Sequence, residues 1–174
     1  MSVSETVSVG CFDRTVCLRV DGKGTFQNSV PVKDFIKQMV VRGYRDFVVD
    51  LANCELMDST FMGTLAGAAL RLRELGEGVL AVVNANPRNK DLLVGLGLDQ
   101  LFDVHSDHGG REFLLEEANL VPAKAGSSGL DQKEAVLEAH EALATADAAN
   151  ASRFRDVIDF LRQEMERSNE DTRS

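Results

Sequence analysis

The sequence lacks several features that would place it in a specialised class of protein. It has no tryptophan, one tyrosine and only three prolines among 174 residues. Its apolar runs fall short of the roughly 20 residues needed to cross a bilayer. The first ten residues, MSVSETVSVG, have neither the basic nor the apolar region of a secretory signal. We therefore expect a cytoplasmic protein without a membrane-spanning segment.

Cysteine and positive charge are also scarce. The three cysteines (Cys11, Cys17 and Cys54) are odd in number and form no C-x-x-C pair, which favours reduced, buried thiols over a disulfide framework or a zinc site. A net charge of −9 argues against nucleic acid as a partner, because binding phosphates requires clustered Lys and Arg. HSDH (105–108) resembles a metal-ligand cluster only loosely, since such loop histidines are usually solvated. We expect no metal and no cofactor.

What the sequence does contain is a regular alternation of two patterns up to about residue 118. Short apolar or β-branched runs predict strands, and apolar residues three and four apart between polar caps predict helices. The predicted strands are 7–12, 15–22, 46–51, 78–85 and 101–104. The predicted helices run from Asn28 or Ser29 to Gly43, from Asp58 or Ser59 to about Glu74, from Asn86 to Gly95 or Gly97, and within 109–120.

Strands that alternate with helices at this spacing imply right-handed crossovers and a mainly parallel sheet, so the fold class is a small α/β domain. The first two strands are expected to pair across Asp13 and Arg14. Gly63 and Gly67, one turn apart, are expected to let their helix lie close on the sheet. The glycines of DGKGT (21–25) are interpreted as a turn, because this segment lacks the rest of a phosphate-binding loop.

The C-terminal part has a different composition. Residues 121–130 are rich in Pro, Gly, Ser and Ala and predict a linker between a domain at 1–120 and a helical extension at 131–170. Apolar residues spaced by seven run through the extension, but polar residues such as Asp147 interrupt the second seam. Two helices that break near Asn150 are therefore at least as well supported as one continuous coiled coil. We expect a helical hairpin packed on its own domain or on a second copy in a homodimer, with a partner-docking element as the alternative.

The stretch CELMDSTFMGTLAG (54–67) holds the candidate site. Ser59 could be a nucleophile, a phosphorylation site or part of a helix cap. As a nucleophile it lacks the G-x-S-x-G elbow, and none of His105, His108 and His140 stands in a setting that suggests a base. We therefore expect a protein that is not an enzyme. As a cap, Asp58 or Ser59 can accept hydrogen bonds from the first-turn amides.

The order and spacing of motifs over residues 10–118 resemble a STAS domain, the fold of bacterial anti-sigma factor antagonists. In that family a buried strand ends in Asp, and Asp-Ser-Ser/Thr-Gly then opens a helix. A Gly-containing turn and a late Gly-Leu-x-x-x-Phe follow. The residues at these places are Asp50, Asp58, Ser59, Thr60, Gly76, Gly78, Gly97, Leu98 and Phe102. The sequence departs from the pattern at Phe61, where the family usually has Gly.

The resemblance implies a STAS-type small mixed, mainly parallel sheet packed with helices. It also implies that an anti-sigma factor serine kinase phosphorylates Ser59, with Thr60 the weaker alternative, and that a PP2C-type phosphatase reverses this. The unphosphorylated form would bind the kinase through Asp58, Ser59, Thr60, Phe61 and Met62. Phe61 would either turn into the core or stand out as an apolar anchor. The alternative function is an unphosphorylated STAS scaffold or adaptor in a larger signalling or lipid-transport complex.

Overall fold

A seven-stranded sheet forms the centre of the computed structural model, which describes residues 6–123 and 129–173. The strands are β1 (Thr6–Phe12), β2 (Thr15–Gly24), β3 (Asp46–Asp50), β4 (Cys54–Met57), β5 (Val79–Val83), β6 (Asp103–Val104) and β7 (Val121–Pro122). Their order is β6-β5-β3-β2-β1-β7, and β4 pairs with the far end of β2. The pairs from β2 to β6 are parallel, whereas β1 is antiparallel to both β2 and β7. The predicted mixed, mainly parallel sheet is confirmed.

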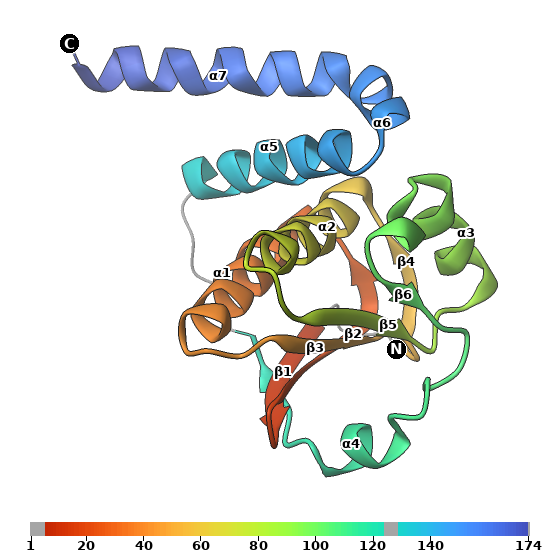
Figure 1. The fold of residues 1–174 in the computed structure, drawn as a ribbon. Coiled ribbons are helices and arrows are strands. Elements are labelled where there is room, and N and C mark those ends of the chain that lie inside the picture. Colours follow the sequence, from red (N-terminus) through yellow and green to blue (C-terminus); the bar gives the residue numbers. More distant parts are fainter. Residues whose placement is uncertain (1–5, 124–128, 174) are drawn as a thin grey trace.

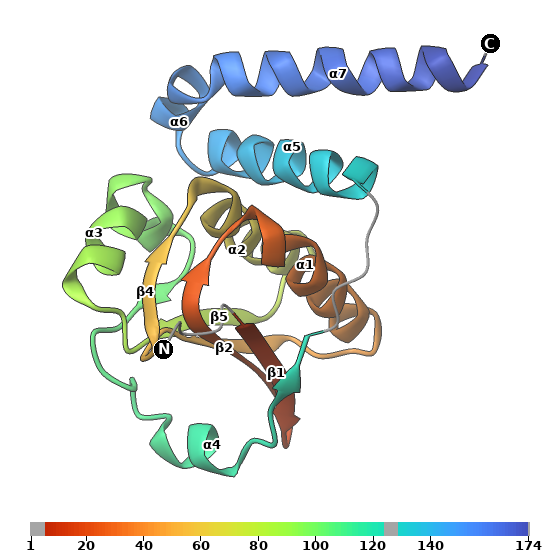
Figure 2. The same cartoon turned by 180° about the vertical axis from the view of Figure 1, so that it is seen from behind.

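The four longest helices lie in layers on one side of this sheet, and α4 (Glu112–Glu117) lies on the opposite side (Figures 1 and 2). Besides α4, the helices are α1 (Phe26–Val41), α2 (Ser59–Glu74), α3 (Pro87–Gly95), the 3₁₀ turn η1 (Leu98–Gln100), α5 (Gly129–Ala146), α6 (Ala148–Arg153) and α7 (Arg155–Arg173). Figures 1 and 2 show α1 and α2 on one face of the sheet, α5 lying on α2, and α7 outermost on α5. None of the helices in the described part of the chain is both long and apolar enough to cross a membrane.

The core lies between the sheet and the first helical layer. The strand predicted at 46–51 is buried on both faces from Phe47 to Asp50, as expected for a central parallel strand. The stripe predicted for α2 is also buried. Its members are Met62, Leu65, Ala66, Ala69 and Leu72. The alternating apolar pattern of the sequence therefore identifies most of the core correctly.

The start of α1 differs from the expectation. The cap is Thr25, whose hydroxyl accepts from Gln27 N, and Asn28 accepts from Thr25 N, so that the two residues form a capping box. The prediction of a cap at Asn28 or Ser29 is wrong by about one turn. Asn28 is the third residue of the helix, and Pro31 lies inside it rather than at its first turn.

The segment DGKGT is also different. Gly22 and Gly24 belong to β2, where they pair with Cys54 and Met57 of β4, so the predicted turn is wrong. Gly22 adopts a φ of 85° at an irregularity of the register, a conformation that favours glycine. The partner strand β4 has four residues and no distinctive pattern of its own. Only a contact between segments about 30 residues apart makes this stretch a strand.

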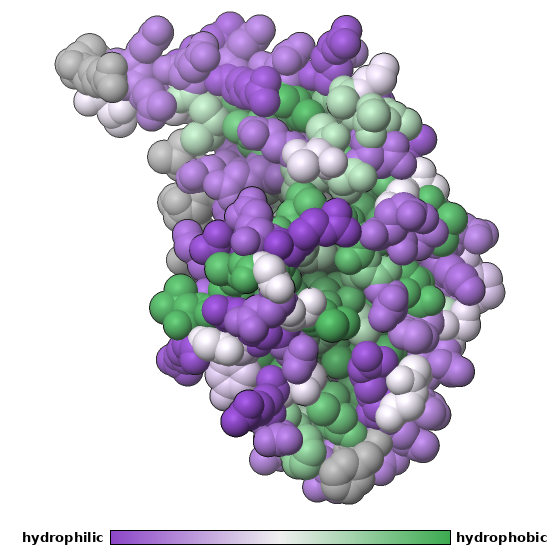
Figure 3. Space-filling model, viewed as in Figure 1, coloured by the Kyte–Doolittle hydropathy of each residue, from purple (hydrophilic) through white to green (hydrophobic). Residues whose placement is uncertain are grey.

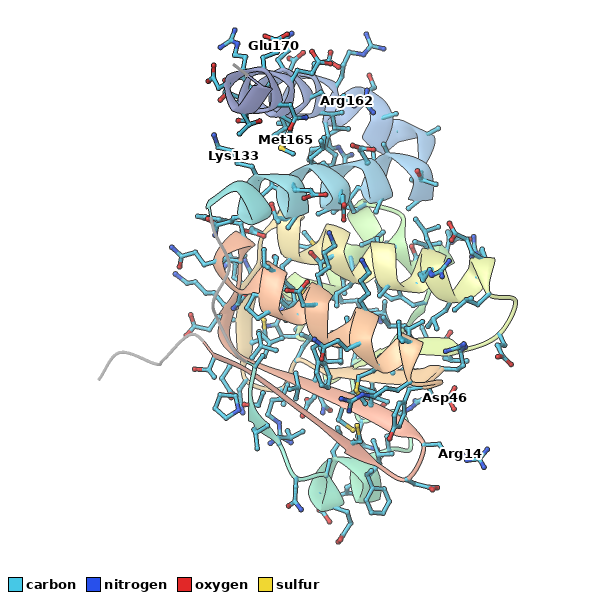
Figure 4. All side chains as sticks on the ribbon, turned by 90° about the vertical axis from the view of Figure 1, so that its left-hand side faces the viewer. Arg14, Asp46, Lys133, Arg162, Met165 and Glu170 are labelled. Atoms are coloured by element: carbon cyan, nitrogen blue, oxygen red, sulfur yellow. The ribbon has the colours of Figure 1, made fainter. Side chains whose placement is uncertain are left out.

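The C-terminal extension is a helical hairpin, as predicted, and the chain turns between Ala146 and Arg155 around Asn150. Ile158 and Leu161 of α7 are buried, and ion pairs join Lys133 to Glu164 and Glu141 to Arg162. Figure 4 shows Met165 on the side of α7 that faces α5 and Glu170 on the opposite side. The outer surface of α7 is mainly hydrophilic in Figure 3.

Candidate functional site

Asp58 is the cap of α2 and contacts a second helix as well. Its backbone is extended (φ −89°, ψ 174°), and its Oδ1 accepts from Phe61 N at 2.8 Å. Its Oδ2 accepts from Phe26 N, at the start of α1, also at 2.8 Å. One carboxylate therefore satisfies amides at two helix N-termini, where negative charge is favourable. Of the two predicted caps, Asp58 is the correct one.

Replacing Asp58 by Ala is expected to lower the free energy of unfolding by about 1–3 kcal/mol, because two amides lose a charged acceptor. Asp58→Asn is the matched control. Its single amide oxygen can serve only one of the two helices, so an intermediate loss is expected. Urea unfolding followed by circular dichroism measures both variants. An Asp58→Ala variant as stable as the wild type would contradict the double-cap role.

Ser59, the first residue of α2, is half-buried and contacts a histidine of the extension. Its Oγ lies 3.0 Å from Nε2 of His140, whose Nδ1 lies 2.8 Å from the carbonyl oxygen of Val136. A carbonyl can only accept, so Nδ1 carries a proton, and in the neutral ring Nε2 accepts from the Ser59 hydroxyl. His140 is 4% exposed, and its ring meets that of Phe154 edge-on at 5.0 Å.

This contact corrects one expectation. The sequence indicated no histidine in a setting to act on Ser59, but α5 lies over this end of α2 and places His140 against the hydroxyl. The two residues are 81 positions apart, so no local pattern joins them. The pair also differs from a hydrolase dyad. Nδ1 of His140 bonds to a backbone carbonyl, not to a carboxylate that would stabilise a charged ring.

The three residues after Ser59 are buried. Thr60, Phe61 and Met62 are 6%, 1% and 3% exposed. Of the two orientations expected for Phe61, the structure shows the inward one. An added Cβ on Gly24 would lie 2.7 Å from the Phe61 ring, so the ring occupies the space beside that glycine. The apolar-anchor interpretation of Phe61 is therefore wrong, and Thr60 and Met62 are not accessible to a partner in this conformation.

The glycines of α2 face the extension and not the sheet. A Cβ on Gly63 would lie 2.3 Å from the carbonyl oxygen of Ala139, whereas one on Gly67 would lie an ordinary 3.7 Å from the Ala142 Cβ. The expectation that these glycines bring α2 close to the sheet is wrong. They bring α5 close to α2, and Lys33 of α1 forms an ion pair with Glu138 of α5.

Asp50, at the end of β3, belongs to a polar cluster on a different part of the domain. Its carboxylate pairs with Arg19 Nε at 3.1 Å and accepts from Asn84 Nδ2 and Ala52 N, each at 3.0 Å. The carboxylate is thus fully partnered, as a buried charge requires. In the part of the chain that the structure describes, no three His, Cys, Asp or Glu side chains form a metal-binding group.

The three thiols are free, and Cys17 and Cys54 are buried as the sequence predicts, whereas Cys11 is only partly buried. Burial raises the pKa of Cys17 to about 11, and the nearby Cys11 contributes to the rise. Burial also raises the pKa of Cys54. Both groups remain protonated near neutral pH and are weak nucleophiles.

The domain contacts the C-terminal hairpin at Leu96 and Gly97, where the Gly-Leu-x-x-x-Phe motif begins. Gly97 has a φ of 73°, and a Cβ there would lie 2.3 Å from a carboxylate oxygen of Asp147. Asn150 is 1% exposed, and its Nδ2 donates to the carbonyl oxygens of Leu96 (2.8 Å) and Leu143 (2.9 Å). The sequence showed Asn150 only as a place where the helix breaks, and no local signal indicates this anchoring role.

The fold agrees with the comparisons with known proteins. The family described as "Mlab, STAS domain" matches residues 9–104, and the chain belongs to this STAS family. No curated protein matches the chain.

Solved structures share the fold at low identity. TM1081 of Thermotoga maritima, provisionally assigned as an anti-sigma factor antagonist, is 20% identical with a TM-score of 0.54, over 62% of this chain and 91% of that one. The anti-sigma factor antagonist SpoIIAA in its unphosphorylated form is 18% identical, with a TM-score of 0.51 over 63% and 96% of the two chains. The phosphorylated Bacillus SpoIIAA gives 19% and 0.51 over 63% and 97%.

Proposed function

We propose that the chain is an anti-sigma factor antagonist whose binding to an anti-sigma factor serine kinase is switched off by phosphorylation of Ser59. The observation that carries the proposal is the position of Ser59, which is the first residue of α2 in a STAS domain and follows directly after its Asp58 cap. A PP2C-type phosphatase would restore the hydroxyl. Kinase, phosphatase and antagonist would meet in the cytoplasm.

The physical setting suits such a switch. Phosphate adds about −1.5 to −2 charges at a helix N-terminus, where the amide dipoles favour anions, so the domain is expected to stay folded. A partner that bound over Ser59 would bury this phosphate next to the Asp58 carboxylate. Burying two neighbouring negative charges is costly unless the partner supplies a cationic side chain. SpoIIAA, which has this fold, is known in both phosphorylated and unphosphorylated forms.

Intact-mass measurement tests the proposal. The chain is incubated with ATP and each anti-sigma factor serine kinase of its source organism. One added phosphate is expected on the wild type and on Thr60→Ala, and none on Ser59→Ala. Equal labelling of wild type and Ser59→Ala would remove Ser59 as the acceptor, and loss of labelling only in Thr60→Ala would move it to Thr60.

A second candidate function is an unphosphorylated STAS scaffold or adaptor in a larger signalling or lipid-transport complex. The observation that favours it is the contact of α5 with Ser59, because the hydroxyl is half-buried and bonded within its own chain. Absence of phosphate with every kinase, together with a stable complex recovered through the C-terminal hairpin, would support the adaptor over the switch.

A further inference from the structure

The surface of α2 that begins at Ser59 is covered by α5 of the same chain. We infer that α5 is a removable lid on this surface, which also accepts a helix of a partner protein, so that lid and partner compete. This inference rests on the proposed function only in treating Ser59 as the modified residue. By "α5 lid" we mean residues 135–143, the part of α5 between its first and last buried residues; α5 packs on α2.

The α5 lid buries only one large aliphatic side chain, Leu143, which joins the core cluster. Its other buried residues are Ala135, Ala139 and His140. A cavity of about 330 Å³ lies beside it, between α1, α2 and α5, and is lined by Ile36, Gly67 and Ala135 among others. Because hydrophobic stabilisation scales with buried apolar area, such a contact opens more easily than the core beneath it.

Phosphorylation of Ser59 and closure of the lid exclude one another. The direct 3.0 Å contact between Ser59 Oγ and His140 Nε2 leaves no room for a phosphoryl group between the two atoms. Phosphorylation also removes the proton that the hydroxyl donates to the ring. The lid must therefore open before a kinase reaches Ser59, and it cannot return to the same place afterwards.

The contact also defines the kind of partner that fits. The close approach of Gly63 to the Ala139 backbone requires a helix with small residues at this point. Lys33 adds a preference for an acidic residue such as Glu138. The partner is thus expected to present an α-helix with two small residues four positions apart and an acidic residue just before the second, the pattern of Ala135, Glu138 and Ala139.

A pair of glycine substitutions tests whether the lid is removable. Gly63→Ala places a methyl group against the Ala139 carbonyl, while Gly67→Ala, one turn further along, makes only an ordinary contact. Hydrogen exchange by mass spectrometry is expected to show at least tenfold faster exchange of residues 135–143 in Gly63→Ala, with β3 and β5 unchanged, and no acceleration in Gly67→Ala. Unchanged exchange in Gly63→Ala, or loss of protection throughout the sheet, would overturn the inference.

A reversible crosslink tests whether the lid controls Ser59. A Cβ at position 67 lies 3.7 Å from that of Ala142, within the range of disulfides, so Gly67→Cys with Ala142→Cys locks the lid without altering Ser59. The reduced form of the same protein is the control. Oxidation is expected to slow phosphorylation of Ser59 at least tenfold in the kinase assay described above.

The two experiments separate failure of the lid from failure of the switch. Equally fast phosphorylation of the oxidised and reduced forms would overturn the lid and leave the switch intact. If neither form accepts phosphate, the proposed switch is wrong. The comparison of hydrogen exchange in Gly63→Ala and Gly67→Ala then still decides whether the α5 lid opens.

Discussion

Replacing Phe61 by Ala is expected to lower the free energy of unfolding by about 3–5 kcal/mol, the usual cost of removing a buried phenylalanine ring. The ring is 1% exposed and lies against Gly24, whose missing side chain cannot fill the cavity that is left. Urea unfolding monitored by circular dichroism gives the value. The size of the loss distinguishes a core residue from an interface residue.

The same substitution at an exposed phenylalanine is the control. Phe160 on α7 is 61% exposed, so Phe160→Ala is expected to change stability by no more than about 0.5 kcal/mol. If the two variants lost similar amounts, or if Phe61→Ala were neutral while weakening a partner complex, the inward orientation of Phe61 would be contradicted.

Replacing Asn150 by Ala is the second change with a large expected effect. Its Nδ2 is the donor to two carbonyl groups, one on each side of the contact between the domain and the hairpin. The Leu96 carbonyl loses its donor, whereas the Leu143 carbonyl still accepts from Asp147 N. The expected cost is about 2–4 kcal/mol, made up of about 1–3 kcal/mol for the unsatisfied Leu96 carbonyl and about 1 kcal/mol for the lost bond to Leu143. Thermal unfolding and hydrogen exchange measure the loss, which should appear first in α5 and α7.

Asn169, an exposed asparagine of α7, provides the matched control. Asn169→Ala is expected to leave both the melting temperature and the exchange of α5 close to the wild-type values. A loss of stability in Asn150→Ala that left the protection of α5 and α7 intact would show that Asn150 does not anchor the hairpin.

Features determined by neighbouring residues could be predicted from the sequence. The buried strand at 46–51 follows from its apolar run, the end of α2 near Glu74 from its apolar stripe, and the cap of α3 from Asn86 and Pro87. A further local signal lies at the start of α1. Thr25 and Asn28, three residues apart, have the spacing of a capping box and would have placed the start of α1 correctly.

The candidate site could be predicted only in part, because its covering comes from a distant segment. The cap at Asp58 follows from the local sequence, and the role proposed for Ser59 follows from the resemblance. The direction of Phe61 depends on Gly24, and the burial of Ser59 depends on His140. Neither contact has a periodicity or a motif, since each is made by packing between elements that are remote in the chain.

The fit between Phe61 and Gly24 has an evolutionary consequence. The two positions share one volume, so a chain with a large residue at 61 needs glycine at 24, and a chain with the usual family glycine at 61 can carry a side chain at 24. A protein in which only one of the two positions had changed would have either two side chains in this volume or an empty cavity. Residues 24 and 61 are therefore expected to covary among relatives, and glycine at 24 would identify those that share this aromatic ring.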